Sequence, residues 1–287
     1  MYKKILVPLD GSHLAEQILR HVYTLAAISE AGVELLWVND PEVFERPPHS
    51  GKEYLERAAA KYLKASFPIE YREIDGRPAE VIVRHALAEP SCLIAMATHG
   101  MSGIQRWLLG SVASKILQTA VNPILLIRPT RGPDSATPIE LRTVIVPLDG
   151  SGLAEKALRH VVPLAKQMKM EVQLMRVYSL PANAYVVADG VIAQGPAQYR
   201  EKLHKEAETY LDGKAQELRA EGLEKVLPMV LEGDPAGEII DLANTTPNSL
   251  IAMSTHGRSG IGRWMLGSVA EKVVQHSRDP VLLIRAA

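Results

Sequence analysis

The stretch KKILVPLDGSHLAEQILRHV at residues 3–22 decides the fold, because it joins two hydrophobic periodicities through one short turn. Residues 4–9, KILVPL, are apolar almost throughout, as a strand buried on both faces must be. After the turn DGS, residues 12–31 place apolar side chains at helical spacing. A strand that leads directly into a helix predicts one unit of a parallel α/β sheet.

The chain carries this unit twice. The same stretch returns as RTVIVPLDGSGLAEKALRHV at residues 142–161, and NPILLIR at residues 122–128 returns as DPVLLIR at residues 279–285. A repeat of this length predicts a tandem of whole domains. We place domain 1 at residues 1–130, a linker rich in Pro, Gly, Ser and Thr at 131–140, and domain 2 at 141–287.

The second copy contains an insertion. Asp10 and Asp149 lie 139 residues apart, whereas Pro123 and Pro280 lie 157 residues apart, so the second copy is longer by about 18 residues. The excess lies between the second and third strands of that copy, and we assign it to residues 179–198. This segment is a candidate lid or docking loop, and the alternative is a spacer.

Strand-like and helix-like segments alternate within each copy. In the first copy the predicted strands are residues 4–9, 33–38, 69–74, 92–97 and 123–128, and the predicted helices are residues 12–31, 52–65, 77–90 and 112–120. This alternation is typical of a parallel sheet with right-handed crossovers and helices on both faces.

Composition limits the class of protein. The chain has 287 residues, 47% of them hydrophobic, and a net charge of -1 with a pI near 6.8, which argues against a basic surface for nucleic acid. Its one cysteine, Cys92, excludes an internal disulfide. The apolar run near the N-terminus is too short for a signal peptide, and no run approaches the roughly 20 residues of a membrane span. We therefore expect a cytoplasmic protein with no membrane partner.

A glycine-rich segment is the most similar part of the two copies. ATHGMSGIQRWLLGS at residues 97–111 returns as STHGRSGIGRWMLGS at 254–268, and 14 of 18 positions agree between residues 94–111 and 251–268. Each segment follows a predicted strand and ends in Gly-Ser before a predicted helix. Glycine lets the backbone approach an anion, and a helix N-terminus attracts one. The pattern predicts a phosphate site, and the alternative is a turn with a helix cap.

Two further pairs of residues are candidates for the same site. Asp10 and Asp149 follow the first strands, where a carboxylate can accept hydrogen bonds from a base or a ribose; the alternative is capping of the next helix, a role also open to the neighbouring serines. His99 and His256 precede the loop glycines, where they could order the loop, contact a ligand or act in acid–base chemistry. Because the sequence lacks G-x-x-x-x-G-K-[ST], G-x-S-x-G and metal-ligand histidine spacings, we assign no catalytic residue and no protein-held metal site.

The VPLDGS strand ends and the paired Gly, nine residues, Gly-Ser loops resemble the universal stress protein family over nearly the whole chain. The resemblance implies two tandem Rossmann-like (adenine nucleotide alpha hydrolase-like) domains, each a five-stranded parallel sheet of order 3-2-1-4-5 with helices on both faces. It also implies that the last strands of the two halves pair, which gives an intramolecular pseudo-dimer. A homodimer of the whole chain is a further expectation.

The family's nucleotide-binding branch implies ATP, with phosphates on the glycine loop and adenine near the first two strands. Mg²⁺ or Mn²⁺ would arrive with the phosphates. The implied nucleotide-binding residues in the first copy are Pro8, Asp10, Ser12, Val38, Ala97, His99, Gly100, Gly110, Ser111 and Val112. Those in the second copy are Pro147, Asp149, Ser151, Val177, Ser254, His256, Gly257, Gly267, Ser268 and Val269.

One departure from the family pattern occurs in both copies, where Ala97 and Ser254 replace the first glycine of the motif. If that position required positive φ, the change would cost on the order of 1 kcal/mol. The function that the resemblance implies is an ATP-binding regulatory protein of the stress response with little or no turnover. Two alternatives are a weak ATPase or adenylate hydrolase using His99 or His256, and a nucleotide-free module that binds protein partners.

Overall fold

The computed structural model describes residues 1–42, 50–64, 67–99, 109–130, 135–180, 196–257 and 266–285. We call the described residues up to 130 the first half and those from 135 onward the second half. The elements of the first half are β1 (Lys4–Leu9), α1 (His13–Glu16), α2 (Leu19–Ser29), β2 (Gly32–Asn39), α3 (Gly51–Tyr62), β3 (Ile69–Asp75), α4 (Pro78–Leu87), β4 (Cys92–Ala97), α5 (Ser111–Thr119) and β5 (Ile124–Ile127). Those of the second half are β6 (Thr143–Pro147), α6 (Gly152–Glu155), α7 (Leu158–Met168), β7 (Glu171–Tyr178), α8 (Pro196–Ala220), β8 (Val226–Glu232), α9 (Pro235–Thr245), β9 (Ser249–Ser254), α10 (Ser268–His276) and β10 (Val281–Ile284).

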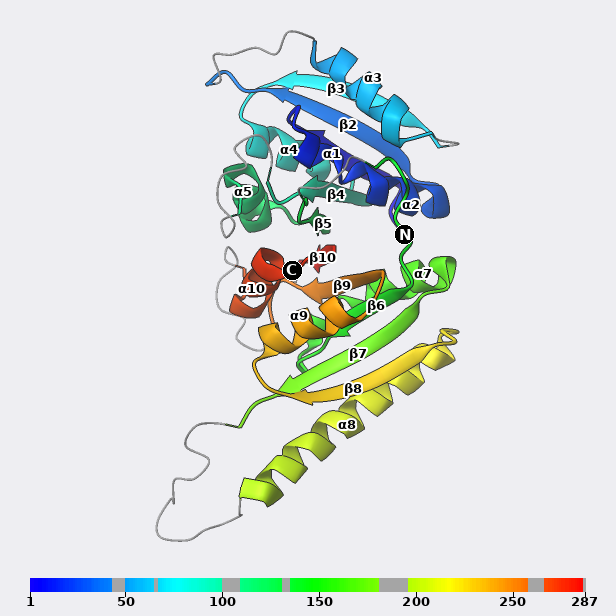
Figure 1. Cartoon of the computed structure of the whole chain (residues 1–287), viewed down its shortest axis with the longest axis vertical. Coiled ribbons are helices and arrows are strands. Elements are labelled where there is room, and N and C mark those ends of the chain that lie inside the picture. The colour runs from blue at the N-terminus through cyan, green and yellow to red at the C-terminus, as the bar shows by residue number, and fades with distance from the viewer. Residues whose placement is uncertain are drawn as a thin grey trace.

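The strands of both halves form one continuous sheet of order β3-β2-β1-β4-β5-β10-β9-β6-β7-β8 (Figure 1). Strands within each half are parallel, and the halves meet where β5 and β10 pair antiparallel, with Leu125 opposite Leu282. The predicted α/β fold, the strand order of each half and the pairing of the last strands are therefore confirmed. This pairing joins the two five-stranded sheets into one sheet of ten strands.

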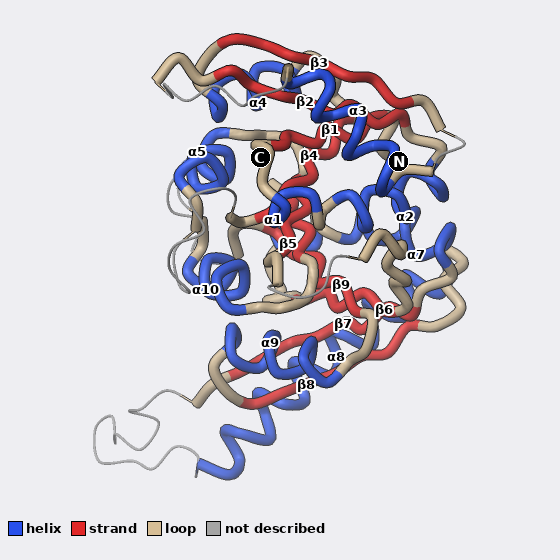
Figure 2. Tube along the Cα trace, turned by 45° about the horizontal axis from the view of Figure 1, so that its top comes forward, coloured by secondary structure: helices blue, strands red, loops and turns tan. Residues whose placement is uncertain are grey.

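Helices cover both faces of the sheet (Figure 2). One apolar cluster packs α2, α3, α7 and α8 against one face, and a second packs α4, α5, α9 and α10 against the other. Strands β4 and β9 are buried along their whole length because they carry helices on both sides. Across the part of the chain that the structure describes, no helix is both long enough and apolar enough to cross a membrane.

The helix predicted over residues 12–31 is wrong in one respect, since the structure divides it into α1 and α2. The division is a tight turn in which N–H groups bond three residues back: Ile18 N–H donates to the Ala15 carbonyl at 3.3 Å and His21 N–H to the Ile18 carbonyl at 3.0 Å. The second half repeats the turn between α6 and α7, with the N–H of Ala157 bonded to the Ala154 carbonyl at 3.2 Å. Apolar spacing alone does not reveal such a turn, because three-residue and four-residue hydrogen bonding keep side chains on nearly the same face.

Two arginines connect the halves beside the central strands. Arg285, which follows β10, donates from Nη1 to carbonyls at the end of α5, at 2.9 Å to Gln118. Arg128, which follows β5, donates from Nη1 to the Gln275 carbonyl of α10 at 3.1 Å. Each half thus supplies a cation to the negative end of a helix in the other half.

Two equivalent histidines, His21 and His160, lie on α2 and α7, which pack against each other where the two halves meet. We call this junction of the halves, centred on the β5–β10 pairing, the seam. Burial lowers the pKa of His21 to about 4, with a further lowering from the positive charge of Arg20 and an opposing effect from a hydrogen bond with the Gln17 backbone. Burial also lowers the pKa of His160. Both imidazoles are therefore held neutral in the folded protein.

The lowered pKa of His21 predicts loss of stability in mild acid. In the unfolded chain the His21 imidazole takes up a proton near pH 6.5, whereas in the folded chain the same imidazole stays neutral down to about pH 4. The free energy of unfolding therefore falls as the pH decreases through this window, by up to about 1.4 kcal/mol per pH unit for this histidine. Urea unfolding at a series of pH values should show a shallower pH dependence for His21→Leu than for the wild type. The exposed His276→Gln variant should keep the wild-type slope, and an unchanged slope in His21→Leu would contradict the assignment.

Candidate functional site

The turn after the first strand of each half positions a carboxylate. Gly150, with φ of 87°, reverses the chain after β6, and Gly11 does the same after β1 with φ of 88°. Oδ1 of Asp149 then accepts the Ser151 N–H at 2.9 Å and the Ser151 hydroxyl at 2.6 Å. These bonds fix the carboxylate at the carboxyl end of the sheet.

Asp10 is held in the same way in the first half. Its Oδ1 accepts the Ser12 N–H at 3.0 Å and the Ser12 hydroxyl at 2.7 Å. The Ser12 Oγ in turn accepts the Ala15 N–H at 3.1 Å, which caps α1, and Ser151 caps α6 through the Ala154 N–H at 3.2 Å. The serines therefore serve as helix caps that orient the aspartates.

The end of the glycine loop is closed by backbone contacts. The N–H of Gly267 donates to the Thr255 carbonyl at 2.9 Å, and that of Gly110 donates to the Thr98 carbonyl at 3.0 Å. A Cβ at Gly267 would lie 3.0 Å from the Thr255 carbonyl oxygen, so a larger residue does not fit without a shift. Gly267 and Gly110 are the N-caps of α10 and α5, and neither helix has a side-chain cap. The first N–H groups of both helices thus face the sheet edge without intrahelical partners.

Ala97 and Ser254, the two departures from the family pattern, cause no backbone strain. Each is the last residue of a strand, β4 or β9. Among the described non-glycine residues, positive φ occurs at Glu30, Lys169 and Asn248 and not at these two. The Ser254 side chain is buried, and its Oγ has no hydrogen-bond partner among the residues that the structure describes.

The two histidines bond to the threonines that precede them. Nδ1 of His99 lies 2.9 Å from the Thr98 Oγ1, and Nδ1 of His256 lies 3.1 Å from the Thr255 Oγ1. The described residues supply no partner for Nε2 of His256, although this atom is buried. The histidines therefore help to order their loops, and His256 keeps one nitrogen for another contact.

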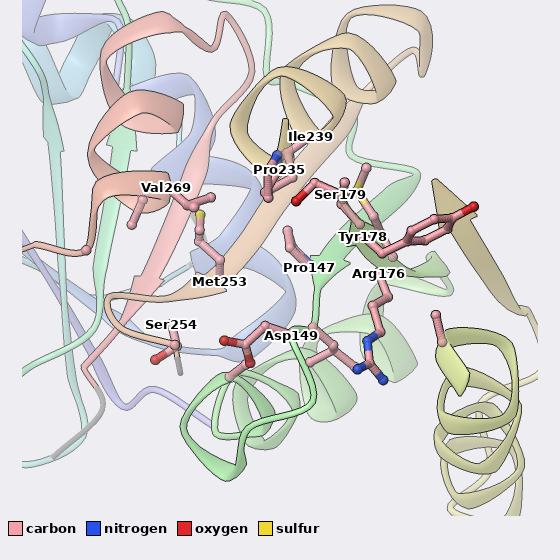
Figure 3. A pocket seen from close by; sticks show the side chains of 18 of the residues that line it. Pro147, Asp149, Arg176, Tyr178, Ser179, Pro235, Ile239, Met253, Ser254 and Val269 are labelled. Atoms are coloured by element: carbon pink, nitrogen blue, oxygen red, sulfur yellow. The ribbon is translucent and has the colours of Figure 1, made fainter. Parts of the chain in front are cut away.

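A cavity of about 500 Å³ opens at the carboxyl ends of β6, β7 and β9 in the second half (Figure 3). Its volume lies in the usual range for small-molecule sites. It gathers nine of the ten residues that the sequence assigns to the second copy, while Ser151, the helix cap, is not in its lining. The nine are Pro147, Asp149, Val177, Ser254, His256, Gly257, Gly267, Ser268 and Val269.

The carboxylate and the glycine loop touch inside this cavity. A Cβ added at Gly257 would overlap the Asp149 carboxylate, so the carboxylate lies directly against the backbone of that glycine. In Figure 3, Met253, Ser254 and Val269 lie on one side of Asp149, and Arg176 and Tyr178 lie on the other. The cavity thus extends from the N-terminus of α10, past the carboxylate, to the end of β7.

The sequence did not predict the wall of the cavity that lies opposite the glycine loop and is formed by β7 and α8. Arg176 and Tyr178 come from β7, and Tyr199, Leu203 and Glu206 come from α8. The Arg176 guanidinium lies 4.9 Å from the centre of the Tyr210 ring, and the Tyr178 hydroxyl donates to Glu232 at 3.1 Å. The start of α8 has no counterpart in the first copy, so comparison of the copies gave no signal for it.

The first half places its assigned residues at the same edge of the sheet. Pro8 and Val38 lie in β1 and β2, Ala97 and His99 at the end of β4, and Gly110, Ser111 and Val112 at the start of α5. Gly100 lies outside the described residues, as do most of both glycine loops and residues 181–195 of the predicted lid segment. Among the described residues, no group of three or more His, Cys, Asp and Glu side chains is placed to hold a metal ion.

Comparison with known proteins gives the family. The model of the universal stress protein family matches residues 1–128 and again 140–285. A universal stress protein of Methanocaldococcus jannaschii is 32% identical over 144 residues, which are 50% of this chain and 82% of that protein. One of Mycolicibacterium smegmatis is 23% identical over 98% of this chain and 96% of its own. The crystal structure of a universal stress protein from Archaeoglobus fulgidus, 20% identical, covers 100% of both chains with a TM-score of 0.69. The chain belongs to the universal stress protein family, as a member that carries the family domain twice.

Proposed function

We propose that this chain is a nucleotide-binding regulatory protein of the stress response, and that the cavity of the second half binds ATP. The phosphates would lie at the N-terminus of α10, and the base and ribose would lie toward Asp149 and the end of β7. Mg²⁺ or Mn²⁺ would enter with the nucleotide, held mainly by phosphate oxygens.

One observation carries this proposal: complementary groups for the parts of a nucleotide converge on one cavity. The N-terminus of α10 offers N–H groups and a partial positive charge for phosphates. Two buried polar atoms on the cavity wall, Ser254 Oγ and His256 Nε2, have no partner among the described residues. Burying such an atom without a hydrogen bond lowers the stability of the fold, unless a ligand or a water molecule supplies the bond. Asp149 provides an oriented acceptor for ribose or amino groups.

The same site favours binding over turnover. Within the described lining of the cavity, the side chains that could act as a base are His256, Asp149 and Glu206. Nδ1 of His256 is already in contact with Thr255 Oγ1, and Oδ1 of Asp149 already accepts two hydrogen bonds from Ser151. A weak ATPase is the second candidate, because Nε2 of His256 is buried in the wall without a partner among the described residues. Steady-state phosphate release by the wild type decides between them: no release above background favours binding alone. If the wild type releases phosphate, unchanged release in His256→Ala would remove the histidine from any hydrolytic role.

Isothermal titration calorimetry with MgATP tests the proposal. The wild-type chain should give saturable heat, and Gly267→Val should abolish the second-half signal, because its side chain would press on the Thr255 carbonyl at the phosphate end. Gly213→Ala, in open space on α8, should bind like the wild type. Absence of heat with ATP, ADP, AMP and cyclic AMP in a folded wild-type protein would contradict the proposal.

A further inference from the structure

The two halves carry very different side chains at an equivalent position of the second strand beside the site. Trp37 of β2 and Arg176 of β7 lie 139 residues apart, the same spacing that relates Asp10 to Asp149, so they are equivalent. Each also contacts an equivalent tyrosine on the following helix: the Trp37 ring lies 5.4 Å from that of Tyr54. Arg176 lies over Tyr210.

In the first half, the indole of Trp37 fills the space between the β1 turn and α3. A Cβ at Gly11 would lie 3.4 Å from the six-membered ring, and a Cβ at Gly51, the first residue of α3, would overlap the indole. Trp37 Nε1 donates to Asn39 Oδ1 at 2.8 Å, and the residue is 8% exposed. The side chain is therefore packed, hydrogen-bonded and closed off from solvent on the side of Asp10.

In the second half, the equivalent space is open. Arg176 turns its guanidinium onto the Tyr210 ring. The stretch EYLE at residues 53–56 aligns with TYLD at 209–212, so Ala207, three residues before Tyr210, is equivalent to Gly51, three residues before Tyr54. Arg176 and Ala207 both line the 500 Å³ cavity. Helix α8, with 25 residues against 12 in α3, continues past this point and adds Tyr199 and Leu203 to the wall.

We propose that the two halves have divided their roles: the second half takes the adenine nucleotide, and Trp37 closes the equivalent position of the first half. This inference rests on the proposed function. A base that entered the first half beside Asp10 would have to displace a buried aromatic ring from the turn, from α3 and from its hydrogen bond. A base that enters the second half meets a preformed cavity. The expected stoichiometry is one nucleotide per chain.

Native mass spectrometry with MgATP measures this stoichiometry, and three variants locate the site. The wild type should hold one nucleotide. Arg176→Trp, which places an indole in the second half, should lose it, and Trp37→Ala should raise the number toward two. Leu227→Trp, on an exposed position of β8, controls for the added tryptophan and should still hold one nucleotide.

Photolabelling of the wild type with 8-azido-ATP, followed by peptide mapping, gives the same answer without a mutation and covers the case in which Trp37→Ala does not fold. Label confined to the second half supports the division. Two nucleotides per wild-type chain, or label in first-half peptides, would overturn the division and leave nucleotide binding intact. Absence of any bound nucleotide in the wild type and the variants would overturn the proposed function itself.

Discussion

Replacing Gly257 with alanine is expected to weaken ATP binding about 10- to 100-fold. The new Cβ would overlap the Asp149 carboxylate, which Ser151 holds in place with two hydrogen bonds. The carboxylate would have to leave the position from which, on the proposed function, it would contact the nucleotide. A hydrogen bond to a charged group contributes about 1.5–3 kcal/mol, which corresponds to this range of affinity. Calorimetric titration with MgATP measures the change.

The control for this variant is another glycine-to-alanine change in the same half. Gly213 lies in α8, where an added Cβ meets nothing within 4 Å, so Gly213→Ala should keep the wild-type affinity. Thermal unfolding of both variants shows whether the fold is kept. A Gly257→Ala protein that binds ATP as tightly as the wild type would show that Asp149 and the glycine loop do not act on one ligand.

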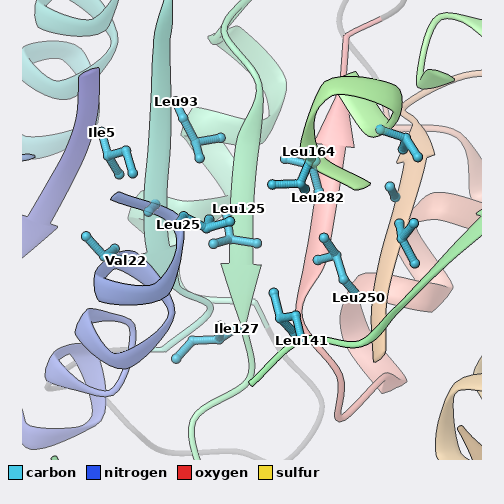
Figure 4. Packing of buried hydrophobic residues seen from close by; sticks show 14 of the residues in the cluster. Ile5, Val22, Leu25, Leu93, Leu125, Ile127, Leu141, Leu164, Leu250 and Leu282 are labelled. Carbon is cyan, nitrogen blue, oxygen red and sulfur yellow. The ribbon is translucent and has the colours of Figure 1, made fainter. Parts of the chain in front are cut away.

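Replacing Leu282 with alanine is expected to lower the free energy of unfolding by about 2–5 kcal/mol, the usual cost of truncating a buried leucine. Leu282 is 2% exposed and lies opposite Leu125 where β10 pairs with β5 (Figure 4). Because this contact joins the halves, the loss should appear in the unfolding of the whole chain. Urea unfolding followed by circular dichroism measures it.

Two comparisons make the Leu282 result specific to the seam. Leu227 on β8 is 45% exposed, and Leu227→Ala should change stability by no more than about 0.5 kcal/mol. The double variant with Leu125→Ala should depart from additivity, because residues in contact are energetically coupled. Additive losses, or a first half that unfolds as in the wild type, would show that the seam does not couple the two halves.

Much of the fold could be predicted because its signals are local and appear twice. The apolar run at residues 4–9 predicted a buried strand with the bounds that β1 has, and the matching run in the second copy forms β6. The break between α1 and α2 could not be predicted, because a tight turn preserves the apolar face. The pairing of β5 with β10 is distant in sequence, and it was expected from the family resemblance and not from any local pattern.

The residues of the cavity could likewise be predicted only where both copies carry the same local pattern. That Asp149, Gly257 and Gly267 lie together could be predicted, because turn and loop chemistry favours those residue types and the duplication repeats them; all three line the cavity. Arg176 could not be assigned, since its equivalent is a tryptophan and the two copies gave no shared pattern. The part of the cavity wall that α8 forms could not be predicted either, because the start of this long helix has no counterpart in the first copy.

The seam between β5 and β10 also determines how the two sites can change over time. In a dimer of identical chains, every substitution enters both sites at once, so a residue that blocks one site blocks its twin. Here the two partners are encoded separately and yet held in one sheet. A mutation at position 37 leaves position 176 untouched, and the partner supplies the stability while one site is altered. Joining two copies in one chain therefore allows the two halves of a pseudo-dimer to differ in sequence, so that one half can change its site while the other keeps its own.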